Sequence, residues 1–176
     1  MHRLFVAIRP PQPILDQLLD MMEGIPNVRW QGEDQLHLTL RFIGEVERPQ
    51  AEDIATALGG IHHPRFELCL SGVGTFERRG KGALWAGLAP QEPLKALHKK
   101  IDQACLRAGI APDTRAYHPH ITLARTGRQT GPLGPFLERW AGLSSPAFPV
   151  EHIRLYESRL GSEGASYTVV ARYPLG

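Results

Sequence analysis

HLTLRFIG at residues 37–44 decides the fold, because HITLARTG at residues 120–127 repeats its pattern 83 positions later. In both segments a His and a Thr alternate with Leu or Ile, so a β-strand would carry the polar pair on one face and the apolar residues on the other. The apolar run around residue 4 returns around residue 84, and the run at residue 66 returns at residue 148. The sequence therefore predicts two similar halves, each with the element order β-α-β-α-β.

Hydrophobic spacing predicts the individual elements. The predicted strands are residues 3–8, 37–44, 66–76, 83–88, 119–125, 148–160 and 166–173, and the predicted helices are residues 13–22, 49–58, 94–105 and 135–140. We expect a single domain over residues 1–176, made of two lobes at about 3–76 and 83–160 and a closing strand at 166–173. Two like lobes usually pack about a pseudo-two-fold axis, so the two His-Thr strands should face each other across a cleft.

The composition is that of an ordinary globular protein. The chain has 176 residues, and its 20 basic and 18 acidic side chains leave a net charge of +2, from which no nucleic-acid binding follows. Cys69 and Cys105 have no second thiol nearby in sequence, so we expect free thiols rather than a zinc ribbon or a disulfide framework. The apolar run from Leu4 to Ile8 is too short for a signal peptide or a membrane span, which favours a soluble, cytoplasmic protein.

The pair of His-x-Thr strands is the feature that carries chemistry. A single His on a strand is more often structural, but two matching copies inside apolar runs would need two matching sets of buried partners. Two imidazoles on opposite sides of a phosphate can share the proton transfers of a displacement at phosphorus. One takes a proton from water, and the other gives a proton to the leaving oxygen. Each Thr hydroxyl can donate to a non-bridging oxygen. A strained ribose 2′,3′-cyclic phosphate suits this site, and without a carboxylate cluster in the sequence we expect neither a metal nor a cofactor.

These motifs resemble those of a known family. HLTL at His37 and HITL at His120 are similar to the paired motifs of the two-histidine (2H) phosphoesterases. RLFVAI, HLTLRFIGEV, ALWAGL and HPHITLAR look like segments of the bacterial RNA 2′,3′-cyclic phosphodiesterases, historically called 2′-5′ RNA ligases, and the resemblance runs from Arg3 to about Tyr173.

The resemblance implies a bilobal α+β fold with antiparallel sheets flanking a central cleft. It also implies hydrolysis of RNA 2′,3′-cyclic phosphate termini to 2′-phosphates, and a reversible ligase activity that forms 2′-5′ linkages. The implied partners are RNA ends or small cyclic nucleotides, with no membrane and no obligate protein partner.

Roles for single residues follow from the same resemblance. His37 and His120 match the catalytic histidines, with His37 as the acid that protonates the departing ribose oxygen and His120 as the base that activates water. Thr39 and Thr122 match the phosphate-binding threonines. Arg125 matches an Arg after the family's second motif and is a candidate substrate contact, although it reaches the cleft only if the strand bulges or ends there.

Other residues carry weaker signals. Arg41 shares the predicted face of His37 and is either a substrate contact at the cleft rim or a solvated strand residue. Trp30 and Tyr117, each shortly before a motif, are candidate base-stacking surfaces. A basic connector, which either binds RNA phosphates beyond the scissile one or is a solvated hairpin, contains Arg78, Arg79 and Lys81.

Two other functions compete with a metal-free phosphodiesterase. A non-catalytic RNA- or nucleotide-binding module would keep the cleft without turnover, but such a module has no need for the two proton-transfer groups that both motifs retain. A metal-dependent phosphodiesterase would need ligands. His118 and His120 offer two, yet no acidic or thiol partner lies near them in the sequence.

Overall fold

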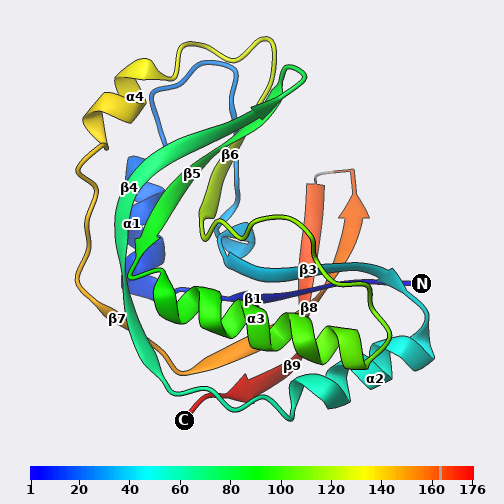
Figure 1. The fold of residues 1–176 in the computed structure, drawn as a ribbon. Helices are drawn as coiled ribbons and strands as arrows, with labels where there is room; N and C mark the ends of the chain where they lie inside the picture. The colour runs from blue at the N-terminus through cyan, green and yellow to red at the C-terminus, as the bar shows by residue number, and fades with distance from the viewer. Residues whose placement is uncertain (163) are drawn as a thin grey trace.

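The computed structural model describes residues 1–162 and 164–176, which form a curved antiparallel sheet and four α-helices (Figure 1). The strands are β1 (His2–Ile8), β2 (Arg29–Trp30), β3 (Leu38–Val46), β4 (Phe66–Arg78), β5 (Lys81–Ala89), β6 (Ile121–Thr126), β7 (Phe148–Val150), β8 (His152–Gly161) and β9 (Gly164–Pro174). The helices are α1 (Gln12–Met21), α2 (Arg48–Leu58), α3 (Glu92–Arg107) and α4 (Gly134–Arg139), with a 3₁₀ turn at Glu33–Gln35. Among the described residues, no helix has the length and apolar character needed to cross a membrane.

The sheet divides into two lobes at the motif strands. Antiparallel neighbours follow the order β7-β4-β5-β6-β3-β1-β8-β9, and β2 pairs with β6. At the centre, β3 and β6 meet at one residue pair, Leu38 opposite Ile121. Beyond that pair the strands diverge, β6 running with β4 and β5 and β3 running with β1 (Figure 1). The motif strands therefore lie side by side at the junction of the two lobes.

Each lobe contains strands from both halves of the sequence. β4 belongs to the first half but pairs with β5, because a two-residue turn folds the two strands into a hairpin. Both turn residues, Arg79 and Gly80, have positive φ, of 55° and 75°, as the type I′ turn of a tight hairpin requires. β8 belongs to the second half and pairs with β1 of the first. The spatial lobes therefore differ from the predicted lobes at 3–76 and 83–160.

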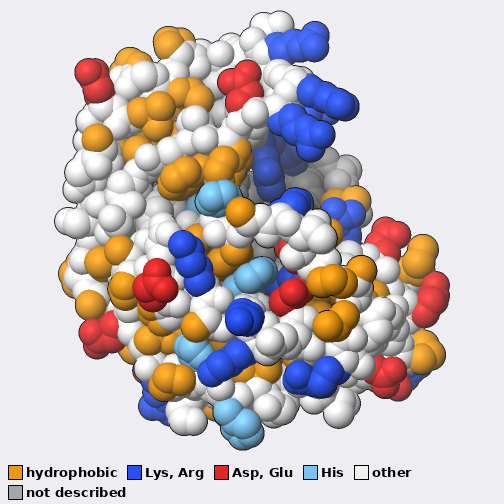
Figure 2. Space-filling model, viewed as in Figure 1, with side chains coloured by type: hydrophobic (Ala, Val, Ile, Leu, Met, Phe, Trp, Pro, Cys, Tyr) orange, Lys and Arg blue, Asp and Glu red, His pale blue; other side chains and the backbone are white. Residues whose placement is uncertain are grey.

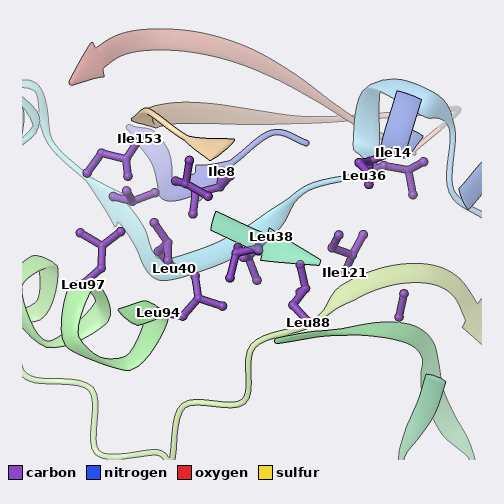
Figure 3. Close-up of a cluster of buried hydrophobic side chains, with 14 of the residues drawn as sticks. Ile8, Ile14, Leu36, Leu38, Leu40, Leu88, Leu94, Leu97, Ile121 and Ile153 are labelled. Atoms are coloured by element: carbon purple, nitrogen blue, oxygen red, sulfur yellow. The ribbon is translucent and has the colours of Figure 1, made fainter. Parts of the chain in front are cut away.

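A continuous apolar core holds the first motif strand from behind. In α3, the buried residues Leu94, Leu97, Ile101 and Ala104 recur at spacings of three and four, so one side of the helix is apolar. These residues share a buried cluster with Leu40 of β3 (Figure 3). The packing of α3 against β3 thus fixes the buried face of the strand that directly follows His37.

The α+β class, the antiparallel sheets and the helices agree with the sequence prediction, and helix ends differ by one or two residues. The predicted strand at 148–160 is broken at residue 151, because β7 pairs with β4 in one lobe and β8 pairs with β1 in the other. The basic connector lies at the end of the β4–β5 hairpin, where Arg78 pairs with Lys81, so the hairpin expected as one of its two alternatives is present. The two-residue strand β2 was not predicted, since it is too short to show a period. Both cysteines are free, as predicted.

Candidate functional site

The two motifs line one cleft at the junction of the lobes. His37 and His120 come directly before β3 and β6, and both line a cavity of about 1120 Å³ together with Thr39 and Thr122. The strands meet at the residue that follows each histidine, which brings the two motifs side by side. Four polar side chains from distant parts of the sequence thus share one site.

Both histidines make the same backbone contact. Nδ1 of His37 donates to the carbonyl oxygen of Gln35 at 2.7 Å, and Nδ1 of His120 donates to that of His118 at 2.6 Å. Because a carbonyl oxygen only accepts, each bond fixes a proton on Nδ1 and leaves Nε2 to exchange protons with a ligand. Either imidazole can therefore accept a proton at Nε2 when neutral and give one up when charged.

Aromatic rings surround each histidine. The ring centroid of Phe5 lies 4.9 Å from that of His37, and Tyr167 approaches His37 edge-on at 5.2 Å. Phe76 approaches His120 edge-on at 4.9 Å. These rings remove water from the imidazoles and so disfavour their charged form.

The surroundings lower the pKa of both histidines. Burial lowers the pKa of His37 from 6.5 to about 4, the bond to the Gln35 carbonyl opposes this, and the positive charges of His120 and Arg125 add to the lowering. The pKa of His120 is also lowered, mainly by burial and further by the charge of Arg125. In the free protein both imidazoles are therefore predominantly neutral at pH 7.

A β-bulge follows the Thr in each motif strand. In β3, Leu40 is an extra residue without a partner opposite it on β1, directly after Thr39. In β6, Leu123 is the extra residue relative to β5, directly after Thr122. The two bulges are 83 positions apart, as the two motifs are. Each bulge reverses the alternation of side chains beyond it.

The bulges decide which residues reach the cleft after the threonines. Arg125 lines the cleft because β6 bulges before it. Phe42, at the matching position of the first motif, also lines the cleft. Regular alternation places the apolar residues of the first motif segment, Phe42 among them, on the face away from His37; for Phe42 this was wrong, because it assumed an unbroken strand. The repeat spacing that pairs Phe42 with Arg125 was the signal that could have revealed it.

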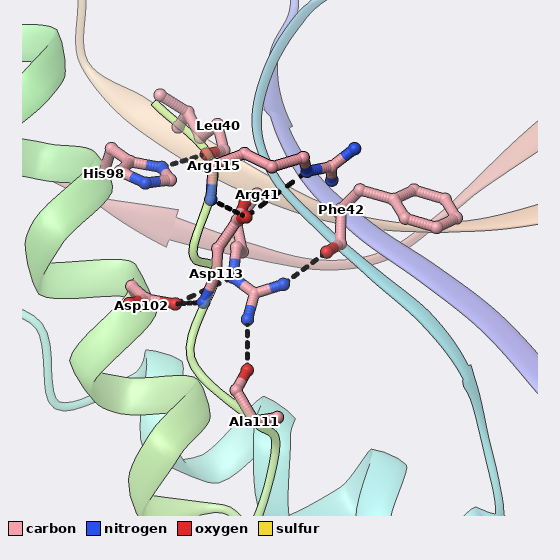
Figure 4. A network of polar contacts seen from close by, with 8 residues as sticks. All are labelled: Leu40, Arg41, Phe42, His98, Asp102, Ala111, Asp113 and Arg115. Carbon is pink, nitrogen blue, oxygen red and sulfur yellow. Dashed lines mark hydrogen bonds and ion pairs between the residues drawn. The ribbon is translucent and has the colours of Figure 1, made fainter. Parts of the chain in front are cut away.

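Arg41 does not lie in the cleft. Its side chain is only 6% exposed, and its Nε donates to Asp102 of α3 at 2.9 Å (Figure 4). Its Nη2 donates to the carbonyl of Ala111 at 2.7 Å. The prediction that Arg41 shares the face of His37 was wrong, because the bulge at Leu40 turns Arg41 to the opposite side. Arg41 instead ties β3 to α3 and to the segment that leads to the second motif.

Tyr117 and Trp30 also lie outside the cleft lining. The hydroxyl of Tyr117 donates to the carbonyl of Thr39 at 2.9 Å, and its ring stacks on His98 at 4.2 Å with the planes 1° apart. Trp30 packs against Phe136, with ring centroids 5.9 Å apart, and lines a second cavity. Neither ring is placed to stack a base in the main cleft.

Basic side chains and exposed aromatic rings form the rest of the cleft wall. The positive residues are Arg3, Arg78, Lys81, Arg115 and Arg125, against one acidic residue, Glu77, within the described lining. Figure 2 shows Lys and Arg side chains gathered around the hollow. Phe42 and Phe76 are 40% and 39% exposed, and the guanidinium of Arg3 lies 5.2 Å from the Phe42 ring centre. The cleft thus suits an anionic ligand that carries flat rings.

The described side chains offer no clustered metal ligands. Over residues 1–162 and 164–176, no group of three or more His, Cys, Asp or Glu side chains could hold a metal ion. His118, which the sequence offered as a second ligand beside His120, contacts His120 through its backbone carbonyl.

Comparison with known sequences gives the family. The profile of the 2′-5′ RNA ligase superfamily matches residues 13–161. The chain belongs to this superfamily. A superfamily protein from Escherichia coli, named RNA 2′,3′-cyclic phosphodiesterase, is 30% identical over 99% of this chain and 97% of its own length. One of the same name from Geobacillus stearothermophilus is 31% identical over 89% of this chain, which spans only 50% of that longer protein.

Solved structures of the superfamily share the fold. E. coli LigT in its apo form matches with a TM-score of 0.80 at 28% identity, covering 99% of this chain and 97% of that one. LigT complexed with 3′-AMP matches with the same TM-score of 0.80 at 28% identity, covering 99% and 98%. The expected bilobal α+β fold of the two-histidine phosphoesterases is therefore confirmed.

Proposed function

We propose that this protein hydrolyses RNA 2′,3′-cyclic phosphate termini to 2′-phosphates without a metal ion. The observation that carries the proposal is the convergence of two identically anchored histidines and two threonines in one basic cleft. The names of the relatives and the complex of LigT with 3′-AMP support the same substrate class.

The proposed reaction uses His37 as the acid and His120 as the base, the roles that the resemblance to the two-histidine phosphoesterases implies. The cyclic phosphate sits between the motifs, and the hydroxyls of Thr39 and Thr122 donate to its non-bridging oxygens as negative charge grows on them. Nε2 of His120 takes a proton from water, and the water oxygen forms a bond to phosphorus. The bond from phosphorus to O3′ breaks, and Nε2 of His37 gives O3′ its proton. The product carries the phosphate on O2′.

The lowered pKa of His37 makes substrate binding part of this mechanism. As the acid, His37 must be protonated, yet burial holds its pKa at about 4 in the free protein. A phosphodiester anion bound next to it raises the pKa of the imidazole, because an opposite charge favours the charged form. The substrate therefore helps to protonate the group that protonates its own leaving oxygen.

The same site supports ligation. When the 5′-hydroxyl of a second RNA replaces water, its oxygen attacks phosphorus, the proton passes to His120, and the bond to O3′ breaks as before. The product is a 2′-5′ linkage, and the reverse reaction regenerates the cyclic phosphate. We propose this as a secondary activity of the same four residues.

An oligoribonucleotide that ends in a 2′,3′-cyclic phosphate, incubated with the protein in excess EDTA, tests the function. We expect a 2′-phosphate product, identified by mass spectrometry or NMR, at a rate that EDTA does not change. His37→Ala and His120→Ala should each lower the rate by about 10² to 10⁴, while His62→Ala, at an exposed histidine outside the cleft, should not. No turnover by the unaltered protein would favour the binding module, and loss of turnover in EDTA would favour the metal-dependent enzyme.

A leaving group that needs no protonation separates the roles of the two histidines. A substrate analogue with such a group at the 3′ position should restore the rate of His37→Ala and leave His120→Ala slow. Rescue of His120→Ala instead would reverse the roles. A full rate in either single variant with the natural substrate would contradict the two-histidine mechanism.

A further inference from the structure

A second cavity of about 680 Å³ lies beside the main cleft. Gln35, Ala165 and Tyr167 line both spaces, so the two are separated by these shared residues rather than by a layer of core. Gln35 is fixed there, because its Nε2 donates to the carbonyl of Ala165 at 2.9 Å. The main cleft and the second cavity are therefore neighbours that share one wall.

Three arginines from separate segments converge on this second cavity. They are Arg9 after β1, Arg29 of β2 and Arg154 of β8. None of them forms an ion pair with a carboxylate among the described residues, although Glu33 and Asp34 line the same cavity.

Arg154 is the most constrained of the three. Its Nη1 donates to the hydroxyl of Tyr156 at 3.3 Å, and its Nε is buried without a hydrogen-bond partner in the described structure. A buried guanidinium nitrogen that lacks a partner in the protein needs an acceptor oxygen from water or from a ligand. Tyr156 and Tyr167 add aromatic surface to the same walls. Cationic and aromatic side chains together are the usual composition of a single-strand RNA site.

The second cavity lies on the His37 side of the cleft. Tyr167, which lines both spaces, contacts the His37 ring edge-on at 5.2 Å. Gln35, which also lines both, accepts the Nδ1 hydrogen bond of His37 at its carbonyl. The charge of Arg9 also acts on the His37 imidazole. A ligand group beyond His37, as seen from the reacting phosphate, would therefore meet this cavity.

We propose that the second cavity binds the backbone phosphates of the RNA strand that precedes the cyclic phosphate. The proposal rests on the proposed function, in which His37 protonates a ribose oxygen and so has the terminal ribose on its side of the phosphate. The rest of the RNA continues from the 5′ carbon of that same ribose. The strand leaves the cleft past Gln35 and Tyr167, and its next phosphates face Arg154 and its neighbours. Water, the other reactant, approaches from the His120 side, where no RNA is attached.

Two substrates that differ only in RNA length test the proposal. The first is a 2′,3′-cyclic mononucleotide, which has no upstream phosphate, and the second is an oligoribonucleotide with the same terminal nucleotide. Arg154→Gln should lower kcat/KM for the oligonucleotide by about tenfold, the loss of one charged contact to phosphate, and leave the mononucleotide within twofold. Arg107→Gln, the same change at an exposed residue that lines neither space, should affect neither substrate.

Salt dependence gives a second measurement. For single-stranded RNA, each phosphate contact contributes about 0.7 to the slope of log affinity against log salt. Arg154→Gln should reduce that slope by about this amount for the oligonucleotide, and Arg107→Gln should leave it unchanged.

Each other outcome has a definite meaning. Equal losses for the two substrates would make Arg154 a structural residue, and no loss for either would mean that the RNA does not enter the second cavity. Both results overturn the inference while leaving the hydrolysis of cyclic phosphate intact. If the unaltered protein hydrolyses neither substrate, the proposed function itself fails. An oligonucleotide that is turned over no better than the mononucleotide, with an equal salt slope, also overturns the inference.

Discussion

Removing the hydroxyl of Tyr117 should slow catalysis although Tyr117 does not line the cleft. This residue stands three positions before His120, and its hydroxyl donates to the carbonyl of Thr39 at 2.9 Å. It thus connects the segment that carries the second motif to the strand of the first. His98, on which Tyr117 stacks, donates to the next carbonyl, that of Leu40, at 2.6 Å. Two stacked rings therefore hold the carbonyls of Thr39 and of the bulge residue Leu40.

The expected cost in stability is small compared with the expected cost in rate. Tyr117→Phe deletes one hydrogen bond and leaves a carbonyl without its donor, a loss of about 1 to 2 kcal/mol in the free energy of unfolding. A domain of this size is typically stable by about 5 to 15 kcal/mol, so the variant remains almost fully folded. A shift of about 1 Å at a reacting group can lower a rate by about 10²-fold. We expect a partial shift of Thr39 and a loss of about tenfold in kcat.

Tyr173→Phe is the matched control. The hydroxyl of Tyr173 also donates to a backbone carbonyl at 2.9 Å, that of Ala55 in α2, and Tyr173 does not line the cleft. Urea unfolding should show comparable losses of stability in the two variants. Steady-state kinetics with a cyclic-phosphate substrate should show a slower reaction only for Tyr117→Phe.

A double variant shows whether Tyr117 acts through Thr39. If it does, adding Tyr117→Phe to Thr39→Val should lower the rate little further, because the group that Tyr117 positions is already gone. Independent, multiplying losses would contradict this connection. Equal activity of Tyr117→Phe and Tyr173→Phe would refute the positioning role altogether.

Three further predictions follow from the same contacts. Burial lowers the pKa of His37 from 6.5 to about 4, so between these pH values the unfolded chain binds a proton that the folded protein excludes. The free energy of unfolding should therefore fall as pH falls from 6.5 towards 4. Urea titrations should show a weaker pH dependence for His37→Asn. Arg41→Ala removes the charged partner of Asp102 and leaves it only the backbone N–H of Asp113 as a donor, which should lower stability by about 3 kcal/mol while KM stays within about twofold. A large rise in KM without unfolding would mean that Arg41 contacts the substrate. Thr39→Val and Thr122→Val should each lower kcat by about 10 to 10³ with the fold intact by circular dichroism, and parent rates with unchanged KM in both would make the threonines structural.

The sequence predicted those features that depend on period and repetition. The spacing of apolar residues located the four helices, and the repeat at 83 positions located the two motif strands that the structure brings to one cleft. Both signals are local or come from comparing the chain with itself. The sequence did not predict that β4 pairs with β5 and that β8 pairs with β1, strands of the other half. This pairing depends on the β4–β5 turn and on the break between β7 and β8 at residue 151, and neither feature leaves a periodic signal in the sequence.

Bulges explain the errors within the site. A strand was predicted to alternate without interruption, which placed Arg41 beside His37 and Phe42 behind it. One extra residue, Leu40, reverses both placements. The sequence at a bulge has no distinct composition here, since Leu40 is as apolar as its neighbours. Only the condition stated for Arg125, that the strand must bulge or end for it to reach the cleft, anticipated this geometry, and the structure contains a bulge in both motif strands.

The direction of the reaction must come from residues that break the repeat. Two imidazoles with the same Nδ1 anchor and two threonines at the same spacing are equivalent under exchange of the halves, so they cannot by themselves decide which side of the phosphate faces water. The symmetry is broken two positions after each bulge residue, at Phe42 in one motif and at Arg125 in the other. It is broken again by the second cavity, which adjoins the His37 side. The cations of the second cavity, Arg9, Arg29 and Arg154, adjoin the His37 side, and the proposed mechanism uses this asymmetry by placing the ribose and its RNA beside His37 and the attacking water beside His120.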